Sequence, residues 1–156
     1  MTITNSEILI RPASLADVAM IAQFQINMAR ETESKELDSL TVHAGVKAVF
    51  ENPSRGFYLV AEYDQAVAGS LLITYEWSDW RNGNIWYIQS VYVSADYRGR
   101  GIFKQLYQHV LQQAKKAGTA KIRLYVEKEN TRAQQAYQAS KMQPLPYFMY
   151  EADVSY

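Results

Sequence analysis

The chain has 156 residues, which is about the size of one compact domain and leaves no room for a second catalytic domain. Its 48% hydrophobic residues are enough for one sizeable core, so the composition is not that of a disordered chain. Sixteen Lys and Arg balance sixteen Asp and Glu, and this zero net charge gives no general attraction to nucleic acid or to an anionic membrane.

The cysteine and histidine counts restrict the chemistry further. With no Cys, the chain has no disulfides, no cysteine nucleophile and no cysteine-ligated zinc, and two histidines (His43 and His109) do not suggest a metal site. The N-terminal segment has no basic region followed by an apolar stretch, and no window is long and apolar enough to cross a membrane. We therefore expect a cytoplasmic protein with neither a metal nor a membrane partner.

The first predicted elements are a short strand and two helices. A strand over residues 8–10 precedes a helix from Ser14, its N-cap, to about Arg30. Thr41 is then predicted to cap a second helix that ends before Pro53.

The next elements form the expected sheet and its main helix. Residues 57–62 and 67–75 are rich in β-branched and aromatic side chains and predict a hairpin that turns at residues 63–65. The run 85–93 is apolar on both alternating faces, which is typical of a central strand covered on both sides. A wide apolar stripe then predicts a helix that begins at Ile102 and is stopped by Gly118.

The last predicted elements are a strand over 121–127, a helix from Asn130 or Thr131 to about Lys141, and a strand over 148–154. The strand–helix–strand order from 85 to 127 implies a right-handed parallel crossover beside antiparallel hairpins. We therefore predict one α/β domain over residues 1–156, α+β by some schemes, with a mixed, mostly antiparallel sheet flanked by helices.

The segment from Val91 to Lys104 carries the strongest chemical signal, because it joins a buried strand to a helix through two glycines and two arginines. Glycines let the backbone approach a ligand closely, and a helix N-terminus with nearby arginines suits a phosphate. The spacing matches neither a dinucleotide-binding fingerprint nor a Walker loop. Taken alone, the segment could equally be a tight turn with solvated arginines.

Two motifs change that interpretation. The residues Arg98-Gly99-Arg100-Gly101-Ile102-Phe103 resemble motif A of the GNAT superfamily of acyl-CoA-dependent N-acetyltransferases, and Asn130-Thr-Arg-Ala-Gln-Gln-Ala-Tyr137 is similar to that family's Asn-x-x-Ala-x-x-x-Tyr helix. The order of elements also fits the family fold over nearly the whole chain. The resemblance implies an N-acetyltransferase that moves an acetyl group from acetyl-CoA to an amine in a ternary complex, with no covalent enzyme intermediate.

The resemblance also implies roles for individual residues. The loop amides would bind the pyrophosphate of coenzyme A, the central strand would pair with pantetheine, and one of its amides would stabilise the oxyanion. Asn130 would contact pantetheine, and Tyr137 would donate a proton to the thiolate. The expected cofactor-binding residues are Val91, Tyr92, Val93, Arg98, Gly99, Arg100, Gly101, Ile102, Phe103, Lys104, Asn130 and Tyr137.

Two positions depart from the family pattern. Phe103 replaces the small residue expected at the end of the loop signature, and Lys141-Met142 stands where glycine followed by an aromatic or aliphatic residue is common. Phe103 could point into the core and leave the loop amides accessible, and Lys141 could alter only the end of the helix. Neither change removes a catalytic group.

The residues on the acceptor side are less well defined. Gln89 stands where many relatives have a glutamate, and an amide can orient a water but cannot act as a base. Glu31, Glu33 and Glu76 are the other candidates for binding or deprotonating the amine, although each could be an ordinary surface carboxylate. Together with aromatic side chains such as Trp77, they predict a small cationic amine as the acceptor, in preference to a protein.

Two alternatives remain open from the sequence. Gln89 and Phe103 would also suit a non-catalytic acyl-CoA-binding or interaction module of the same fold. The aromatic segments could instead be core or the face of a homodimer. Nucleic-acid binding is not expected, because the sequence shows no basic face.

Overall fold

The computed structural model describes residues 7–155. The chain divides into two compact units that separate after Tyr125, and each unit is described by itself. The first unit contains a five-stranded sheet and three α-helices, and the second contains one α-helix. No helix within residues 7–155 is both long and apolar enough to cross a membrane.

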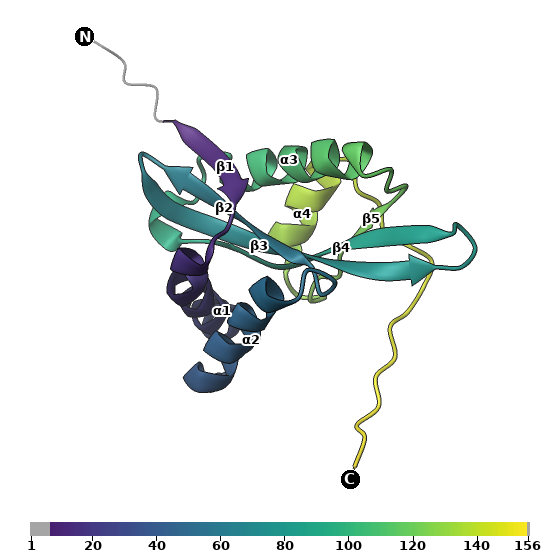
Figure 1. Ribbon diagram of the computed structural model, residues 1–156, viewed down its shortest axis with the longest axis horizontal. Helices are drawn as coiled ribbons and strands as arrows, with labels where there is room; N and C mark the ends of the chain where they lie inside the picture. Colours follow the sequence, from purple (N-terminus) through teal and green to yellow (C-terminus); the bar gives the residue numbers. More distant parts are fainter. Residues whose placement is uncertain (1–6, 156) are drawn as a thin grey trace. The chain divides into compact units, whose positions relative to one another are not determined.

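The sheet has the strand order β1-β2-β3-β4-β5 (Figure 1). Every neighbouring pair is antiparallel except β4 and β5, which are parallel. The mixed, mostly antiparallel sheet and the parallel crossover are therefore confirmed. The strands are β1 (Ile8–Pro12), β2 (Phe57–Tyr63), β3 (Ala66–Ser78), β4 (Gly83–Val93) and β5 (Ile122–Arg123).

The hairpin of β2 and β3 turns where the sequence predicts. Asp64 and Gln65 have φ angles of 48° and 70°, so both loop residues are left-handed. A two-residue loop with this backbone matches the right-handed twist of the paired strands. The tight turn sets the register in which Tyr63 pairs with Ala66, and a bulge between Ala61 and Glu62 then shifts it, so that Phe57 pairs with Ile73 at the far end of β2.

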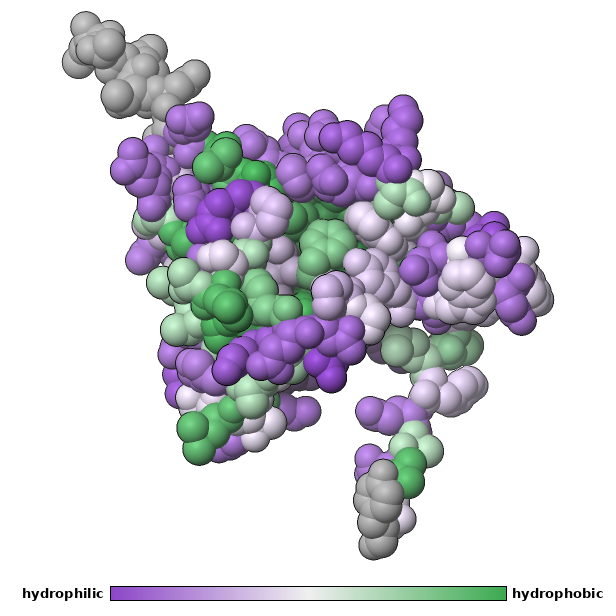
Figure 2. Space-filling view, in the orientation of Figure 1, coloured by the Kyte–Doolittle hydropathy of each residue, from purple (hydrophilic) through white to green (hydrophobic). Residues whose placement is uncertain are grey.

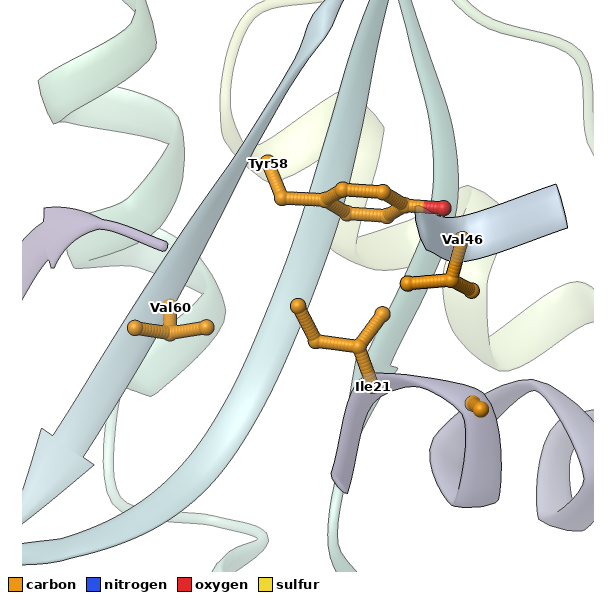
Figure 3. Packing of buried hydrophobic residues seen from close by; sticks show 5 residues of the cluster. Ile21, Val46, Tyr58 and Val60 are labelled. Carbon is orange, nitrogen blue, oxygen red and sulfur yellow. The ribbon is translucent and has the colours of Figure 1, made fainter. Parts of the chain in front are cut away.

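The helices α1 (Val18–Glu33) and α2 (Ser39–Glu51) cover one face of the sheet, and α3 (Ile102–Lys116) covers the other (Figure 1). Under α1 and α2, five buried residues form a core cluster: Ile21, Ala22, Val46, Tyr58 and Val60. Tyr58 and Val60 face the same side because side chains alternate along a strand. Figure 3 shows Ile21 and Val46 on one side of the Tyr58 ring.

Helix α3 is strongly amphipathic. Ile102, Leu106, Val110 and Ala114 are at most 4% exposed, as expected for side chains spaced four residues apart on one helix face. The outer surface over α3 is hydrophilic (Figure 2). Gly118, with a φ of 74°, follows the helix and confirms the predicted stop.

The first two helices differ in detail from the prediction. Helix α1 continues to Glu33, three residues beyond the expected end at Arg30, and stops at Ser34 in a left-handed conformation. The N-cap of α2 is Asp38, not Thr41, because the Asp38 carboxylate accepts hydrogen bonds from the Thr41 amide at 2.9 Å and from its hydroxyl at 2.6 Å. A carboxylate at this position also interacts favourably with the helix dipole.

The last part of the chain contradicts the prediction more clearly. The strand expected over 121–127 is reduced to Ile122–Arg123, because its pairing with β4 stops there. The strand expected over 148–154 is wrong, since residues 143–155 contain no strand. Phe148 and Tyr150 are 82% and 92% exposed. Residues with high strand propensity form a strand only where another strand pairs with them, and no described residue does so here.

The second unit contains α4 (Thr131–Ala139), which ends two residues before the predicted Lys141. The Asn130 side chain accepts a hydrogen bond from the Ala133 amide at 3.1 Å, so Asn130 is the N-cap, one of the two candidates from the sequence.

A buried charge cluster fixes the start of α1. Asp17 is 6% exposed and accepts hydrogen bonds from both terminal nitrogens of Arg11, at 2.8 and 3.0 Å, and from the Ser14 amide at 2.7 Å. Arg11 also contacts Glu62 of β2 at 2.9 Å. The hydrogen bonds from Arg11 hold the pKa of Asp17 below its usual value. This cluster therefore joins β1, β2 and the start of α1.

We predict that Asp17→Asn lowers the free energy of unfolding by about 1–3 kcal/mol at pH 7, because it removes charge-assisted hydrogen bonds from a buried site. A carboxylate with a lowered folded-state pKa stabilises the fold above its unfolded pKa, and this contribution is lost as the pH falls through the folded value. The difference between variant and wild type should therefore shrink below about pH 4. Urea unfolding at several pH values measures both effects.

Glu51→Gln is the control, because Glu51, within residues 7–155, pairs with Lys47 at 3.8 Å on the exposed surface of α2. It should change the unfolding free energy by less than about 0.5 kcal/mol. An equal loss in the two variants, or a loss in Asp17→Asn that does not depend on pH, would contradict the assignment.

Candidate functional site

The loop between β4 and α3 turns on two glycines. Gly99 and Gly101 have φ angles of 77° and 78°, which side-chain-bearing residues adopt only with strain. A Cβ atom added at either position would meet no atom within 4 Å. The backbone conformation, and not crowding by other protein atoms, therefore requires glycine here, and space remains beside the backbone.

The N-terminus of α3 has no side-chain cap. Gly101 occupies the N-cap position, and no side-chain hydrogen bond caps the helix there. The first amides of a helix lack internal partners and carry the positive end of the helix dipole. The amides of Ile102, Phe103 and Lys104 can therefore bind an anion such as a phosphate. Phe103 is half-buried and its ring stacks on Tyr107, with centroids 6.1 Å apart.

The two arginines of the loop already have protein partners. Arg98 donates to Glu31 at 2.6 Å and to the Val93 carbonyl at 2.9 Å. Arg100 donates to the Tyr63 hydroxyl at 2.9 Å and lies 4.8 Å above the Tyr63 ring centroid. Both side chains therefore hold the loop in place, which leaves the loop amides as the first candidates for phosphate contacts.

A β-bulge interrupts the middle of β4. Ser70 pairs with Tyr92 and Leu72 pairs with Gln89, so Leu71 stands opposite two residues, Ser90 and Val91. Ser90 has a φ of 54°. A bulge bends its strand and redirects the backbone groups beside it. Sequence reasoning missed Ser90, and the only signal was a pair of polar residues, Gln89 and Ser90, in an otherwise apolar run.

Beyond the first part of β4, its pairing with β5 ends. The parallel pairs are Trp86 with Ile122 and Tyr87 with Arg123, and the pairing goes no further. Residues 88–93 of β4 therefore form no strand pairing with β5. An extended ligand can use backbone groups of this part of β4, including Val91 and Val93, in the way that an added strand would.

Three of the predicted site residues lie in one cluster. The Tyr92 hydroxyl donates to one oxygen of Glu31 at 3.0 Å, and Arg98 contacts the other oxygen. Burial, together with the nearby Glu31 carboxylate, raises the pKa of Tyr92. Glu31 was expected on the acceptor side, but both of its oxygens are engaged here. Its observed contacts connect α1 to the loop before α3.

The other predicted acceptor residues lie apart from this cluster. Glu76 forms an ion pair with Arg123 at 3.2 Å, and Gln89 donates to the Thr74 hydroxyl at 2.7 Å. Trp77 is 62% exposed, whereas Trp86 is 6% exposed and packs edge-to-face on Phe57. These predicted acceptor residues therefore have partners of their own, and their part in an acceptor site stays a prediction.

Glu33 lies at a cavity of about 320 Å³ bounded by α1, α2, β2 and the bulge of β4. Ser90 and Tyr58 also line it, and burial raises the pKa of Tyr58 to about 12. This cavity extends from an exposed carboxylate to the bulge, so it is the best candidate for an acceptor site in the first unit.

In the second unit, Tyr137 is half-buried in α4, and burial raises its pKa. The phenol therefore stays protonated at neutral pH and can act as a proton donor. The carbonyl oxygen of the Asn130 side chain is used by the helix cap, and the cap does not use its amide nitrogen.

Comparison with known proteins agrees with this geometry. The model of the acetyltransferase (GNAT) family matches residues 20–141. The chain belongs to the GNAT acetyltransferase family. A crystal structure of a possible acetyltransferase from Clostridium difficile 630 is 43% identical, covers 96% of this chain and 99% of its own, and superposes with a TM-score of 0.89. This family membership makes the chain an acyltransferase by class and confirms the resemblance in the two motifs.

Two curated relatives share only part of their length with this chain. Bovine thialysine N-epsilon-acetyltransferase is 35% identical over 79 residues, which are 51% of this chain and 46% of that protein. Mycothiol acetyltransferase of Corynebacterium aurimucosum is 30% identical over 100 residues, which are 62% of this chain and 33% of that protein.

The described residues, 7–155, contain no group of three or more His, Asp or Glu side chains placed to hold a metal ion.

We predict that Gly101→Ala weakens coenzyme A binding at least about tenfold, because a side chain at this φ shifts the loop amides. Gly118→Ala is the matched control: Gly118 has a φ of 74°, equally open space around its Cβ position, and lies at the opposite end of α3. Both variants should lose about 1 kcal/mol of stability. Calorimetric titration with coenzyme A separates them, and equal affinities in the two variants would show that the loop is not the binding site.

Proposed function

We propose that this protein transfers the acetyl group of acetyl-CoA to a primary amine. One observation carries the proposal: the Gly99–Gly101 loop leads into an uncapped helix directly after a strand whose second half is not paired with β5. An anion-binding helix start beside an open strand edge fits a ligand with a phosphate group and an extended amide-containing arm. Coenzyme A has both parts.

The residues proposed to hold acetyl-CoA come from this arrangement in the first unit and, for Asn130, from the family resemblance. The backbone amides of 98–104 bind the pyrophosphate, and Val91 and Val93 pair with the amide groups of pantetheine. Asn130 adds a side-chain contact to pantetheine. Two crystal structures that share this fold at less than 20% identity are complexes: an acetyltransferase from Clostridium acetobutylicum with acetyl-CoA, and an aminoglycoside N-acetyltransferase with CoA. The fold likeness supports the proposal.

In the proposed reaction, the bound thioester supplies the acetyl carbon and a thiolate leaving group. The amine nitrogen forms a bond to the carbonyl carbon, and the carbon–sulfur bond breaks. A main-chain amide of Val91 or Tyr92, next to the bulge, stabilises the negative charge that develops on the carbonyl oxygen. Tyr137 donates a proton to the departing sulfur, which is consistent with its raised pKa.

The amine must lose a proton before it attacks, because a free alkylamine is mostly protonated at neutral pH. Glu33 can accept this proton at the cavity, either directly or through a water. Gln89 cannot accept it, and its amide already donates to Thr74, so its proposed role is to position groups beside the bulge. The carboxylate of Glu33 also favours a small cationic amine, and the bovine relative is named for acetylation of thialysine.

We also propose that residues 1–156 form a single N-acetyltransferase domain that acts in the cytoplasm and uses no metal. We further propose that two copies of the chain form a homodimer. A non-catalytic acyl-CoA-binding module is the second candidate, and the specific observation in its favour is that both Gln89 and Glu31 are held by other protein groups.

We predict that Tyr137→Phe lowers kcat at least about a hundredfold while acetyl-CoA still binds, because the variant lacks the hydroxyl that donates the proton to the leaving thiolate. Thiol release with a panel of small amines measures turnover, and calorimetry measures binding. Tyr125→Phe is the control, since Tyr125 is 60% exposed, and it should keep wild-type turnover. Wild-type turnover in Tyr137→Phe would refute the role of Tyr137, and no turnover by the wild-type protein with any amine would favour the non-catalytic module.

A further inference from the structure

The cavity between α1 and α2 contains a buried amide with an unused hydrogen-bond donor. Gln25 is 8% exposed and lines the cavity, and its Nε2 atom has no hydrogen-bond partner among the described residues. A buried donor without a partner is costly, and such groups are rare in folded proteins. An unpartnered donor on a cavity wall can form its hydrogen bond with a ligand that binds in the cavity.

The rest of the lining restricts the chemistry of that ligand. Much of the wall is apolar, with Met28, Val42 and Val46 as examples, and it includes no Lys or Arg. The charged residue in the lining is Glu33. A ligand carboxylate would therefore be buried without a cation and would be repelled by Glu33, which is unfavourable. A ligand with an uncharged polar group and an apolar chain avoids both the cost of burying a charge and the repulsion by Glu33.

We propose that Gln25 is a specificity-determining residue of the acceptor pocket, and that the preferred acceptor is an apolar amine bearing a neutral carboxamide, such as an amino-acid amide. This inference rests on the acetyl transfer proposed above. A carboxamide offers both an oxygen and N–H groups, so it pairs with Gln25 whichever way the terminal amide of Gln25 is turned. Because the pocket extends to Ser90, an acceptor held by Gln25 lies beside the bulge of β4.

The test compares three amines that share one apolar chain: leucinamide, leucine and 3-methylbutylamine. Wild-type kcat/KM should be at least about tenfold higher for leucinamide than for the other two, since a site built to hydrogen-bond a ligand group discriminates against ligands that lack it. Gln25→Met keeps the side-chain length but removes the amide. It should lower kcat/KM for leucinamide at least about tenfold and change that for 3-methylbutylamine less than about threefold.

Gln23→Met is the control, because Gln23 lies on the same helix but is exposed and bonds to Asn27 at 2.8 Å. It should keep the wild-type order of acceptors. Thermal unfolding gives a second readout: Gln25→Met should be at least as stable as wild type, because no protein hydrogen bond is lost. A destabilised Gln25→Met with equal losses for all amines would mean that Gln25 has a structural partner such as a buried water, and would overturn the proposal.

Calorimetric titration of the same amines into the protein saturated with coenzyme A separates this inference from the proposed function. Tighter binding of leucinamide that disappears in Gln25→Met supports the pocket assignment even without turnover, and the missing turnover would then count against acetyl transfer. Equal binding of the three amines by the wild-type protein, or no binding of any, would overturn the assignment of Gln25.

Discussion

The candidate site depends on strand β4, which must bury its side chains in the core and also keep one backbone edge accessible. Its side chains must be buried to hold the sheet together, as with Ile85 and Ile88, which are 3% and 2% exposed. For the proposed binding of pantetheine, its backbone must also remain available on one edge. The bulge at Ser90 and the end of β5 pairing after Tyr87 satisfy both requirements, because β3 still holds β4 along its other edge.

The loop that follows β4 is stabilised from several directions. Glu31 connects it to α1 through Tyr92 and Arg98, and Tyr63 of β2 holds Arg100. These contacts use both arginine side chains of the loop, so we assign its affinity for a phosphate first to the backbone amides and the helix dipole. A loop fixed by its side chains and open at its backbone binds a ligand with little further ordering. The same contacts join the loop to α1, one wall of the cavity.

Much of the fold could be predicted because local signals were strong. The amphipathic stripe of α3, the turn at Asp64 and Gln65, and the two-sided apolar run of β4 each depend on residues close in sequence. The features that sequence missed depend on distant partners. Nothing local shows that β5 stops after Arg123, that residues 148–154 lack a partner strand, or that Arg98 of the loop pairs with Glu31. The glycine loop was predictable because positive φ needs glycine, whereas the bulge uses a serine and the unpartnered amide of Gln25 becomes visible only in three dimensions.

The most direct test of the central claim is thermal unfolding of the protein with and without acetyl-CoA. A ligand that binds only the folded state stabilises it by about 2.7 kcal/mol at a hundred times its dissociation constant. We expect an upward shift in Tm that grows with acetyl-CoA concentration. An unchanged Tm at millimolar acetyl-CoA would show that the glycine loop and the edge of β4 not paired with β5 do not form a coenzyme A site.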